Sequence, residues 1–321
     1  MSKKTKVWLI IASSLVVFGL ITFAAVMNIY NWDFTKLSSV KYETNTYQLS
    51  EEFSNISIKT TTSDIVFAKS DDGMVRIVCY EIENTKHSIG IQEDTLTINE
   101  TDKRKWYEYI GISIGNPKIT VYLPDNKYNV LSVKESTGNI EISKQFMFES
   151  IDILTNTGDI KNYASTSGVI KIKTSTGDIC VENVSAGAVE LSVSTGNVIA
   201  QSIICKNNIK INVSTGDTQL TDIECKAVIS NGSTGNISLK NVIATENFSI
   251  ERSTGNVKFN SSDAEEIFVK TDTGDVTGSL LTDKVFINKT STGSIDVPKT
   301  ITGGKCEINT DTGDIKINIL Y

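Results

Sequence analysis

A short phrase built around a threonine and a glycine recurs at nearly constant spacing through the C-terminal part of the chain. Its glycines are Gly138, Gly158, Gly177, Gly196, Gly216, Gly235, Gly255, Gly274, Gly293 and Gly313. Successive glycines are always 19 or 20 residues apart. A period of this length, kept over ten copies, is typical of solenoids, in which each repeat forms one turn of a stacked rod.

Within each repeat the residues alternate as they do in a β-strand with one buried face. The predicted inward positions around Gly177 are Ile170, Ile172, Thr174, Thr176, Ile179 and Val181. The alternation shifts by one residue at the glycine, which predicts a corner where glycine takes a positive φ. We expect the threonine before each glycine to form a ladder inside the rod. The Asn, Asp or Ser that follows each glycine suits such a turn.

A single repeat is too small to be stable alone. It buries about five apolar side chains, worth roughly 1.5–3 kcal/mol each, whereas ordering costs about 1.5 kcal/mol for every residue. Neighbouring repeats must therefore supply backbone hydrogen bonds and a continuous core. The sequence predicts an all-β fold, a parallel β-solenoid of about ten rungs of 19–20 residues over positions 131–321.

Residues 51–130 alternate in the same way but lack the regular phrase. The predicted strands are Ile56–Lys59, Ile65–Ala68, Val75–Tyr80, Ser88–Gln92, Thr95–Ile98 and Lys118–Leu123. Thr61 to Ile65 resembles a degenerate phrase with Ser63 in place of the glycine. We expect this region to form an irregular β cap on the solenoid, because the terminal repeats of solenoids are atypical.

The N-terminus predicts a membrane anchor. Residues 7–29 carry no charge, and a helix of that length reaches about 34 Å, enough to cross the hydrocarbon core. The lysines of the stub 1–6 place that stub in the cytoplasm, and residues 30–50 are predicted to be a polar juxtamembrane spacer. The expected location is a bacterial cell membrane, with a single span and the C-terminal domain outside. A signal peptide cleaved after Ala24 is the alternative.

The charge of the predicted external part is negative. Without Lys3, Lys4 and Lys6 the chain keeps 28 basic against 38 acidic residues, a net charge of −10. This balance argues against nucleic acid as a partner and against adhesion to anionic lipid through charge alone.

One stretch resembles a known family. Val121–Pro124, followed by Val130–Val133 and the first phrase Ser136–Ile140, is similar to the bacterial putative-adhesin family, which includes the LiaG-like membrane proteins. The resemblance covers roughly residue 40 to the C-terminus. It implies a β-strand-repeat domain in the cell envelope, of unknown function, with adhesion and envelope-stress signalling as suggested roles. It brings no catalytic residues.

No pattern in the sequence predicts an enzyme, a cofactor or a metal site. Asp272-Thr273-Gly274 and Asp311-Thr312-Gly313 match the aspartic-protease triplet, but they are variants of the repeated phrase and lie two repeats apart. Asp residues after the glycines could line one edge and bind calcium, which needs six to eight oxygens; turn support is the preferred interpretation. His87 is the only histidine, and we expect it at the surface, with neither a catalytic triad nor a histidine metal site.

Five cysteines do not indicate a disulfide framework. Cys205 and Cys225 occupy the same position in consecutive repeats. Their Cα atoms should lie about 5 Å apart, a distance that permits a disulfide but does not require one.

A basic and aromatic segment, residues 103–110, interrupts the pattern of the cap. Its aromatic residues either cover the cap or contact a membrane surface or partner, since exposed aromatic side chains often anchor interfaces. The candidate contact residues are Trp106, Tyr107 and Tyr109.

The function predicted from these observations is that of a non-enzymatic envelope protein with an adhesin-like or scaffolding surface. The alternative is a regulatory partner of an envelope-stress signalling system. The expected partners are the membrane and an envelope protein or glycan. The chain stops soon after the tenth phrase, at Ile317, Ile319 and Tyr321, so self-association through an uncovered C-terminal rung is a further hypothesis.

Overall fold

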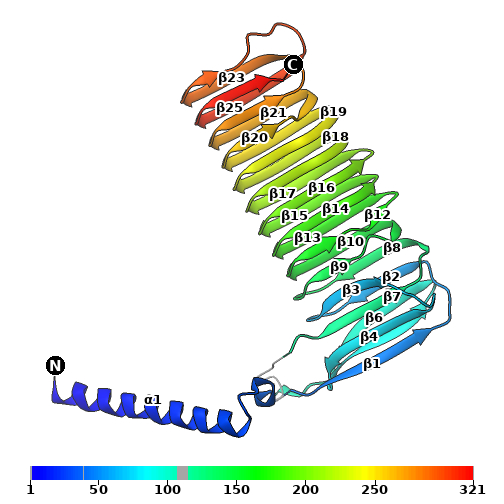
Figure 1. Ribbon diagram of the computed structural model, residues 1–321, viewed down its shortest axis with the longest axis vertical. Coiled ribbons are helices and arrows are strands. Elements are labelled where there is room, and N and C mark those ends of the chain that lie inside the picture. The colour runs from blue at the N-terminus through cyan, green and yellow to red at the C-terminus, as the bar shows by residue number, and fades with distance from the viewer. Residues whose placement is uncertain (1, 39, 107–114, 321) are drawn as a thin grey trace.

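The structure, a computed structural model, describes residues 2–38, 40–106 and 115–320. Helix α1, Lys3–Ile29, lies apart from a long rod of stacked β-strands (Figure 1). Its most apolar window has a mean hydropathy of 2.5 and no buried residues. Length and composition therefore suit a membrane span, although a signal peptide meets the same criteria. A short 3-10 helix, Phe34–Leu37, follows it.

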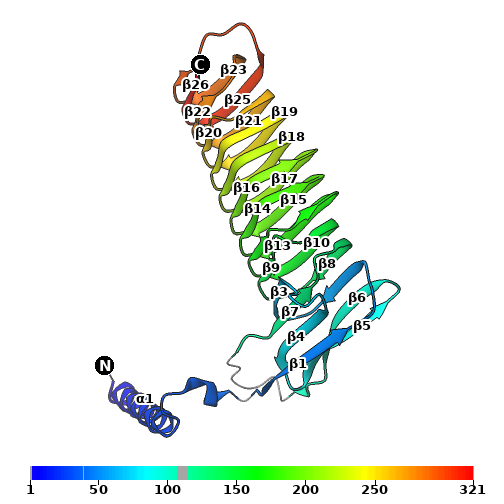
Figure 2. The same cartoon turned by 45° about the vertical axis from the view of Figure 1, so that its right-hand side comes forward.

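Two ladders of strands form the rod, which is the all-β parallel solenoid that the repeats predict (Figures 1 and 2). In spatial order, the first ladder contains β1 (Tyr42–Leu49), β4 (Val75–Ile82), β7 (Lys118–Leu123), β3 (Asp64–Lys69), β9 (Ile140–Ile142), β11 (Ile160–Asn162), β14 (Ile179–Ala186), β16 (Val198–Cys205), the first halves of β18 (Thr218–Thr234) and β19 (Ile237–Thr254), β20 (Val257–Asn260), β22 (Val276–Leu280), β26 (Ile315–Ile319) and β24 (Ile295–Asp296).

The second ladder contains β5 (Thr85–Gln92), β6 (Thr95–Asp102), β2 (Asn55–Lys59), β8 (Lys127–Lys134), β10 (Met147–Thr157), β13 (Val169–Thr176), β15 (Ala188–Thr195), β17 (Asn208–Thr215), the second halves of β18 and β19, β21 (Asp263–Thr273), β25 (Gly304–Thr312) and β23 (Lys284–Thr292). The short β12 (Ser165–Thr166) pairs with the start of β10. Apolar side chains of both ladders form one continuous core between them.

The glycine of each phrase forms the corner where the chain passes from the second ladder to the first. All ten glycines have positive φ, between 130° and 157°, which confirms the predicted corner. The rungs approach so closely there that a Cβ on Gly216 would lie 1.9 Å from the carbonyl oxygen of Gly196. Only glycine fits this corner, for both its backbone conformation and its packing.

The residue after each glycine joins neighbouring rungs. Asn197 Oδ1 accepts a hydrogen bond from the backbone N–H of Asp217 at 2.9 Å, and Asp217 Oδ1 accepts one from the N–H of Asn236 at 2.7 Å. The same bond recurs from Asp64 to the last rung. We call this series the Asx ladder. It explains why a short side chain with an oxygen follows the glycine in every phrase.

The threonine immediately before each glycine faces solvent, so the predicted internal ladder of these residues is wrong. Thr176 is exposed, as is Ser175 before it, whereas Thr174 is buried. The inward–outward alternation stops two residues before the glycine. Two successive side chains point outward there, because the backbone is already turning at this corner. Inward threonines do occur three residues before the glycine, and Thr271 Oγ1 donates to the carbonyl of Gly255 at 3.2 Å.

The cap contains all six predicted strands, within a residue or a few at each end. Thr62 bridges to Thr137, and the N–H of Asn139 donates to Asp64 Oδ1 at 2.8 Å. The degenerate phrase is therefore a true first rung. The predicted spacer over 30–50 is wrong in its second half, where β1 pairs antiparallel with β4. Its alternating sequence from Tyr42 to Leu49 has the period of a strand.

The last two rungs are exchanged in space relative to the sequence. β25 lies between β21 and β23, and β26 lies between β22 and β24. The tenth phrase thus inserts between the eighth and the ninth, after a loop that passes over this end of the rod (Figure 2). The expectation of an uncovered C-terminal rung is wrong, because β23 and β24 form the distal end.

The end rung carries polar side chains where inner rungs carry apolar ones. Lys284 and Asn288 occupy inward positions of β23. Lys284 Nζ forms a buried ion pair with Asp263 Oδ1 at 2.7 Å. Lys284 pairs with Gly304, and a Cβ on Gly304 would meet the backbone of Glu265. The ion pair therefore reaches past a glycine of the inserted rung and fixes the end rung to the rung two places below.

Cysteine pairs can test this order of rungs. Asn309 is opposite both Lys270 and Lys289, which are themselves two rungs apart. We expect Lys270→Cys with Asn309→Cys to form a disulfide readily under mild oxidation, since opposite Cα atoms lie about 4.8 Å apart. Lys270→Cys with Lys289→Cys should not, because about 9.6 Å separates them. Mass spectrometry of proteolytic peptides identifies the disulfide that forms. A disulfide that forms preferentially between positions 270 and 289 would show that the rungs stack in sequence order.

Candidate functional site

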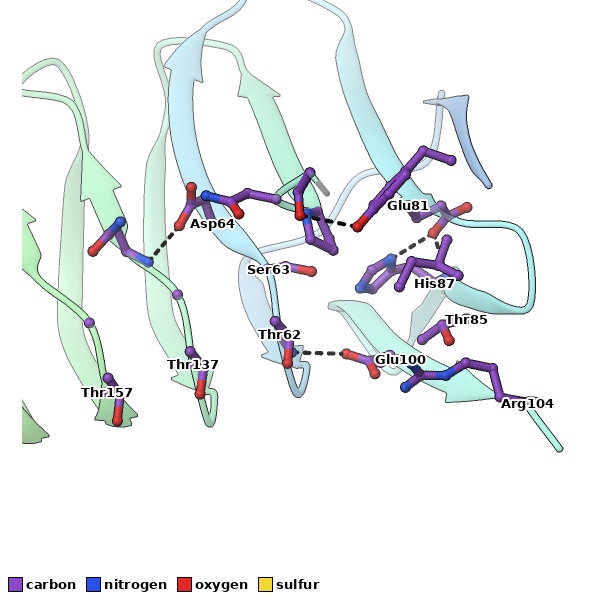
Figure 3. Close-up of a pocket in the computed structure, with 18 residues that line it drawn as sticks. Thr62, Ser63, Asp64, Glu81, Thr85, His87, Glu100, Arg104, Thr137 and Thr157 are labelled. Carbon is purple, nitrogen blue, oxygen red and sulfur yellow. Dashed lines mark hydrogen bonds and ion pairs between the residues drawn. The ribbon is translucent and has the colours of Figure 1, made fainter. Parts of the chain in front are cut away.

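A pocket of about 400 Å³ lies where the cap meets the first rungs. Cap residues lining it include Glu81 on β4, His87 on β5 and Glu100 on β6, while Asp64 and Gly138 belong to rungs (Figure 3). Antiparallel hairpins build the cap side, and parallel rungs build the other. The change in strand direction at this junction leaves room that uniform stacking would fill.

A buried glutamate and a buried histidine, joined by hydrogen bonds, form one wall of the pocket. Glu81 is fully buried and His87 is 4% exposed. Glu81 Oε2 accepts from both the backbone N–H and Nδ1 of His87, at 2.8 and 2.7 Å (Figure 3). Asn45 Nδ2 donates to the other oxygen, Oε1, at 2.7 Å. Every described partner of the Glu81 carboxylate is a donor, as a buried carboxylate requires.

The chain of contacts continues from His87 to a second carboxylate. His87 Nε2 lies 3.3 Å from Thr60 Oγ1, whose hydroxyl donates to Glu100 Oε2 at 2.7 Å. The same oxygen accepts from the backbone N–H groups of Thr61 and Thr62, at 2.5 and 3.4 Å. This chain of contacts thus joins β4, β5 and β6 of the cap to the first rung, through Thr60.

This position of His87 overturns the expectation of a surface residue. In β5 the side chains of Thr85 and His87 both point inward, so strand alternation, applied from Thr85, would have found it. A single histidine does not exclude a catalytic triad or a metal site, because either can be built with one histidine.

Cys79 lies behind the same pair. It is fully buried on β4, two residues before Glu81 and therefore on the same face of the strand. Burial, together with the nearby charge of Glu81, raises the pKa of the Cys79 thiol to about 12. One ligand atom from each of Cys79, Glu81 and His87 lies within 4.8 Å of the others.

Glu135 is a buried acid on the rung side of the junction. It occupies the inward position three residues before Gly138 and is 6% exposed. Its Oε1 accepts from the N–H of Ser63 at 3.1 Å, whereas Oε2 is buried without a hydrogen-bond partner. Burial raises the pKa of the Glu135 carboxyl to about 8, against the lowering effect of the Ser63 N–H. Glu135 is therefore protonated at neutral pH.

The remaining predicted candidates lie elsewhere. Trp106 is 76% exposed, and Tyr107 and Tyr109 fall outside the described residues. Cys205 and Cys225 are buried on adjacent rungs and carry free thiols. The aspartates considered for calcium belong to the Asx ladder, where one oxygen of each accepts a backbone N–H.

The buried acid makes stability depend on pH. The ordinary pKa of a glutamate is 4.5 and that of Glu135 is about 8, so its stabilising contribution is complete below pH 4.5 and is lost as pH rises through 8. We expect the Tm to fall by several degrees between about pH 5.5 and pH 8.5. Glu135→Gln should flatten this fall, and Glu141→Gln, at an exposed position of β9, should not. Equal slopes for both variants in thermal unfolding would contradict the assignment.

Comparison with solved structures finds the same fold in a bacterial protein and weaker likenesses to others. A putative adhesin from Parabacteroides merdae ATCC 43184 is 15% identical and has a TM-score of 0.53, covering 75% of this chain and 97% of that one. A putative adhesin from Bacteroides fragilis NCTC 9343 is 17% identical, with a TM-score of 0.44 and coverage of 87% and 97%. A putative lipid binding protein from Parabacteroides distasonis ATCC 8503 is 15% identical, with a TM-score of 0.46 and coverage of 75% and 98%.

A comparison with curated proteins finds no match. The sequence pattern of a protein family, Toastrack DUF4097, matches residues 53–206 and 204–320. The two matched regions together include the first rung, the cap hairpins and every regular rung. The chain therefore belongs to the Toastrack DUF4097 family.

Proposed function

We propose that this protein is a non-enzymatic component of the bacterial cell envelope, anchored by α1, whose rod presents an adhesin-like surface. The observation that carries the proposal is the exposed edge formed by the threonines that precede the glycines of successive phrases. Thr157, Thr176, Thr195 and Thr215 are all exposed and lie opposite one another on adjacent strands. The edge repeats the threonine hydroxyl at each rung, about every 4.8 Å, and a serine precedes that threonine in all phrases except those with Asn156, Asp272 and Asp311.

A polymer rich in hydroxyl groups suits such an edge. Hydroxyl side chains both donate and accept hydrogen bonds, and a rigid rod has already lost the conformational freedom that binding would otherwise cost. An envelope glycan strand has matching chemistry along its length. We therefore take a glycan as the ligand of this edge, and the similarity in fold to the putative adhesin of Parabacteroides merdae agrees with a binding role.

The anchor and the charge set the orientation. Lys3, Lys4 and Lys6 lie at the N-terminal end of α1, which keeps that end in the cytoplasm and the rod outside. The external part has an excess of acidic residues, so it is held near the membrane by the helix rather than by attraction to anionic lipids. Tethered in this way, the rod places its end rung, β23 and β24, farther from the cap than any other rung.

Attachment of cells tests this function. Cells of a non-adherent bacterium that express the full chain should attach to a surface coated with purified cell-wall glycan. Replacing Thr176, Thr195 and Thr215 by Gln should weaken attachment on the order of tenfold, about 1.4 kcal/mol, because the hydroxyl groups are lost. The matched control, Ser185→Gln with Ile204→Gln, changes exposed positions on the other ladder and should leave attachment unchanged.

Two further arms separate the alternatives. Protease added to intact cells should remove the repeats and abolish attachment; protected repeats would contradict the external orientation. Attachment should survive when an unrelated anchor replaces α1. A phenotype that needs the native helix, without attachment to glycan, would favour the envelope-stress signalling role instead.

A further inference from the structure

The buried Cys79, Glu81 and His87 form a compact set of metal-ligating groups that the adhesin-like role does not use. Cys79 and Glu81 project from the same face of β4, and His87 projects from β5, which follows β4 after a tight turn and belongs to the facing ladder. The three residues are 0%, 0% and 4% exposed. Their ligand atoms lie within 4.8 Å of one another, close enough for one ion to reach all three after a small movement.

We propose that this cluster binds a zinc ion through Cys79 Sγ, a carboxylate oxygen of Glu81 and Nδ1 of His87. A thiolate, an imidazole and a carboxylate together are a ligand set typical of Zn²⁺ among divalent metals. Glu81 and His87 both line the pocket. Three protein ligands therefore leave the fourth tetrahedral position open to a water molecule or to an anionic group in the pocket.

The hydrogen bond between His87 and Glu81 marks the place of the ion. Nδ1 and Oε2 are 2.7 Å apart and share one proton. Two such ligands on a tetrahedral Zn²⁺, each about 2.0–2.2 Å from it, lie roughly 3.4 Å apart. An opening of about 0.7 Å would thus let Zn²⁺ replace the proton. Binding releases that proton and the proton of the Cys79 thiol, so that the ligands are a thiolate, a neutral imidazole and a carboxylate.

The surroundings already orient the ligands. With Nδ1 on the metal, His87 Nε2–H donates to Thr60 Oγ1, 3.3 Å away, and the Thr60 hydroxyl donates to Glu100. Metal-binding histidines usually donate their second N–H to such a partner, which fixes the ring and its tautomer. Asn45 holds the other oxygen of Glu81. The same contacts that make a satisfied ion pair would therefore support a metal ligand set.

Bound zinc would fasten β4 to β5 in the cap, at the end of the rod nearest the anchor. β4 pairs with both β1 and β7, and β5 pairs with β6. An ion shared by β4 and β5 therefore ties together the strands that close the stack. Because the ion binds only the folded cap, it should raise the Tm by an amount that grows with the logarithm of the Zn²⁺ concentration divided by the Kd.

Cobalt and zinc titrations test the site on the full chain in detergent, after treatment with a chelator. Co²⁺ should bind at one equivalent and give a thiolate-to-cobalt charge-transfer band, and Zn²⁺ should displace it. Cys79→Ser should lose the band, and His87→Gln should bind Co²⁺ at least about tenfold more weakly. Cys306→Ser, at another fully buried thiol on a distant rung, should behave like the unmodified chain.

Absence of the band from the unmodified chain, or its persistence in Cys79→Ser, would overturn the proposal. Circular dichroism establishes that each variant is folded, and Cys79→Ala replaces Cys79→Ser if the serine variant is not. A second readout is the Tm: Zn²⁺ should raise it in the unmodified chain and in Cys306→Ser, but not in His87→Gln. A rise of equal size in His87→Gln would place the ion elsewhere.

Discussion

The rod depends on the close approach of consecutive rungs at the glycine corner. The carbonyl oxygen of one glycine occupies the space where the next would carry a Cβ, in every pair from Gly138 to Gly313. This approach brings the following residue of each rung within hydrogen-bond distance of its neighbour and so makes the Asx ladder possible. The ladder in turn fixes the register of both faces, because a slip by one residue would turn every inward side chain outward.

The same constraint explains how the rod ends. Among the residues that follow the ten glycines, Ser294 alone is neither Asn nor Asp. It donates its N–H to Asp314 and, on the end rung, has no further rung to accept from. Lys284 and Asn288 face inward on that rung, where an apolar side chain would lie beside solvent. The exchange of the last two rungs thus puts a repeat with two polar inward side chains at the end, where solenoids carry polar terminal units.

The sequence was enough to predict the fold, because a strict period fixes the rung, the corner and the stacking together. It was not enough to predict that the Thr176 side chain faces solvent, since period-2 alternation does not say where a corner begins. The rung exchange does not follow from the period alone, which is the same for either order of the last two rungs; the polar residues Lys284, Asn288 and Ser294 are its only sign in the sequence. The cluster of Cys79, Glu81 and His87 lies within nine residues, but only the structure shows that β4 and β5 belong to facing ladders and that all three side chains point inward.

The stability of Gly216→Ala, compared with Gly90→Ala, tests the central role of the corner most directly. Gly216 has φ 140° and no room for a Cβ, whereas nothing lies within 4 Å of a Cβ on Gly90. Urea unfolding should show that Gly216→Ala lowers the free energy of unfolding by more than about 3 kcal/mol, from strain and displaced backbone together. Gly90→Ala should change it by less than about 1 kcal/mol. Equal, small effects would contradict the account.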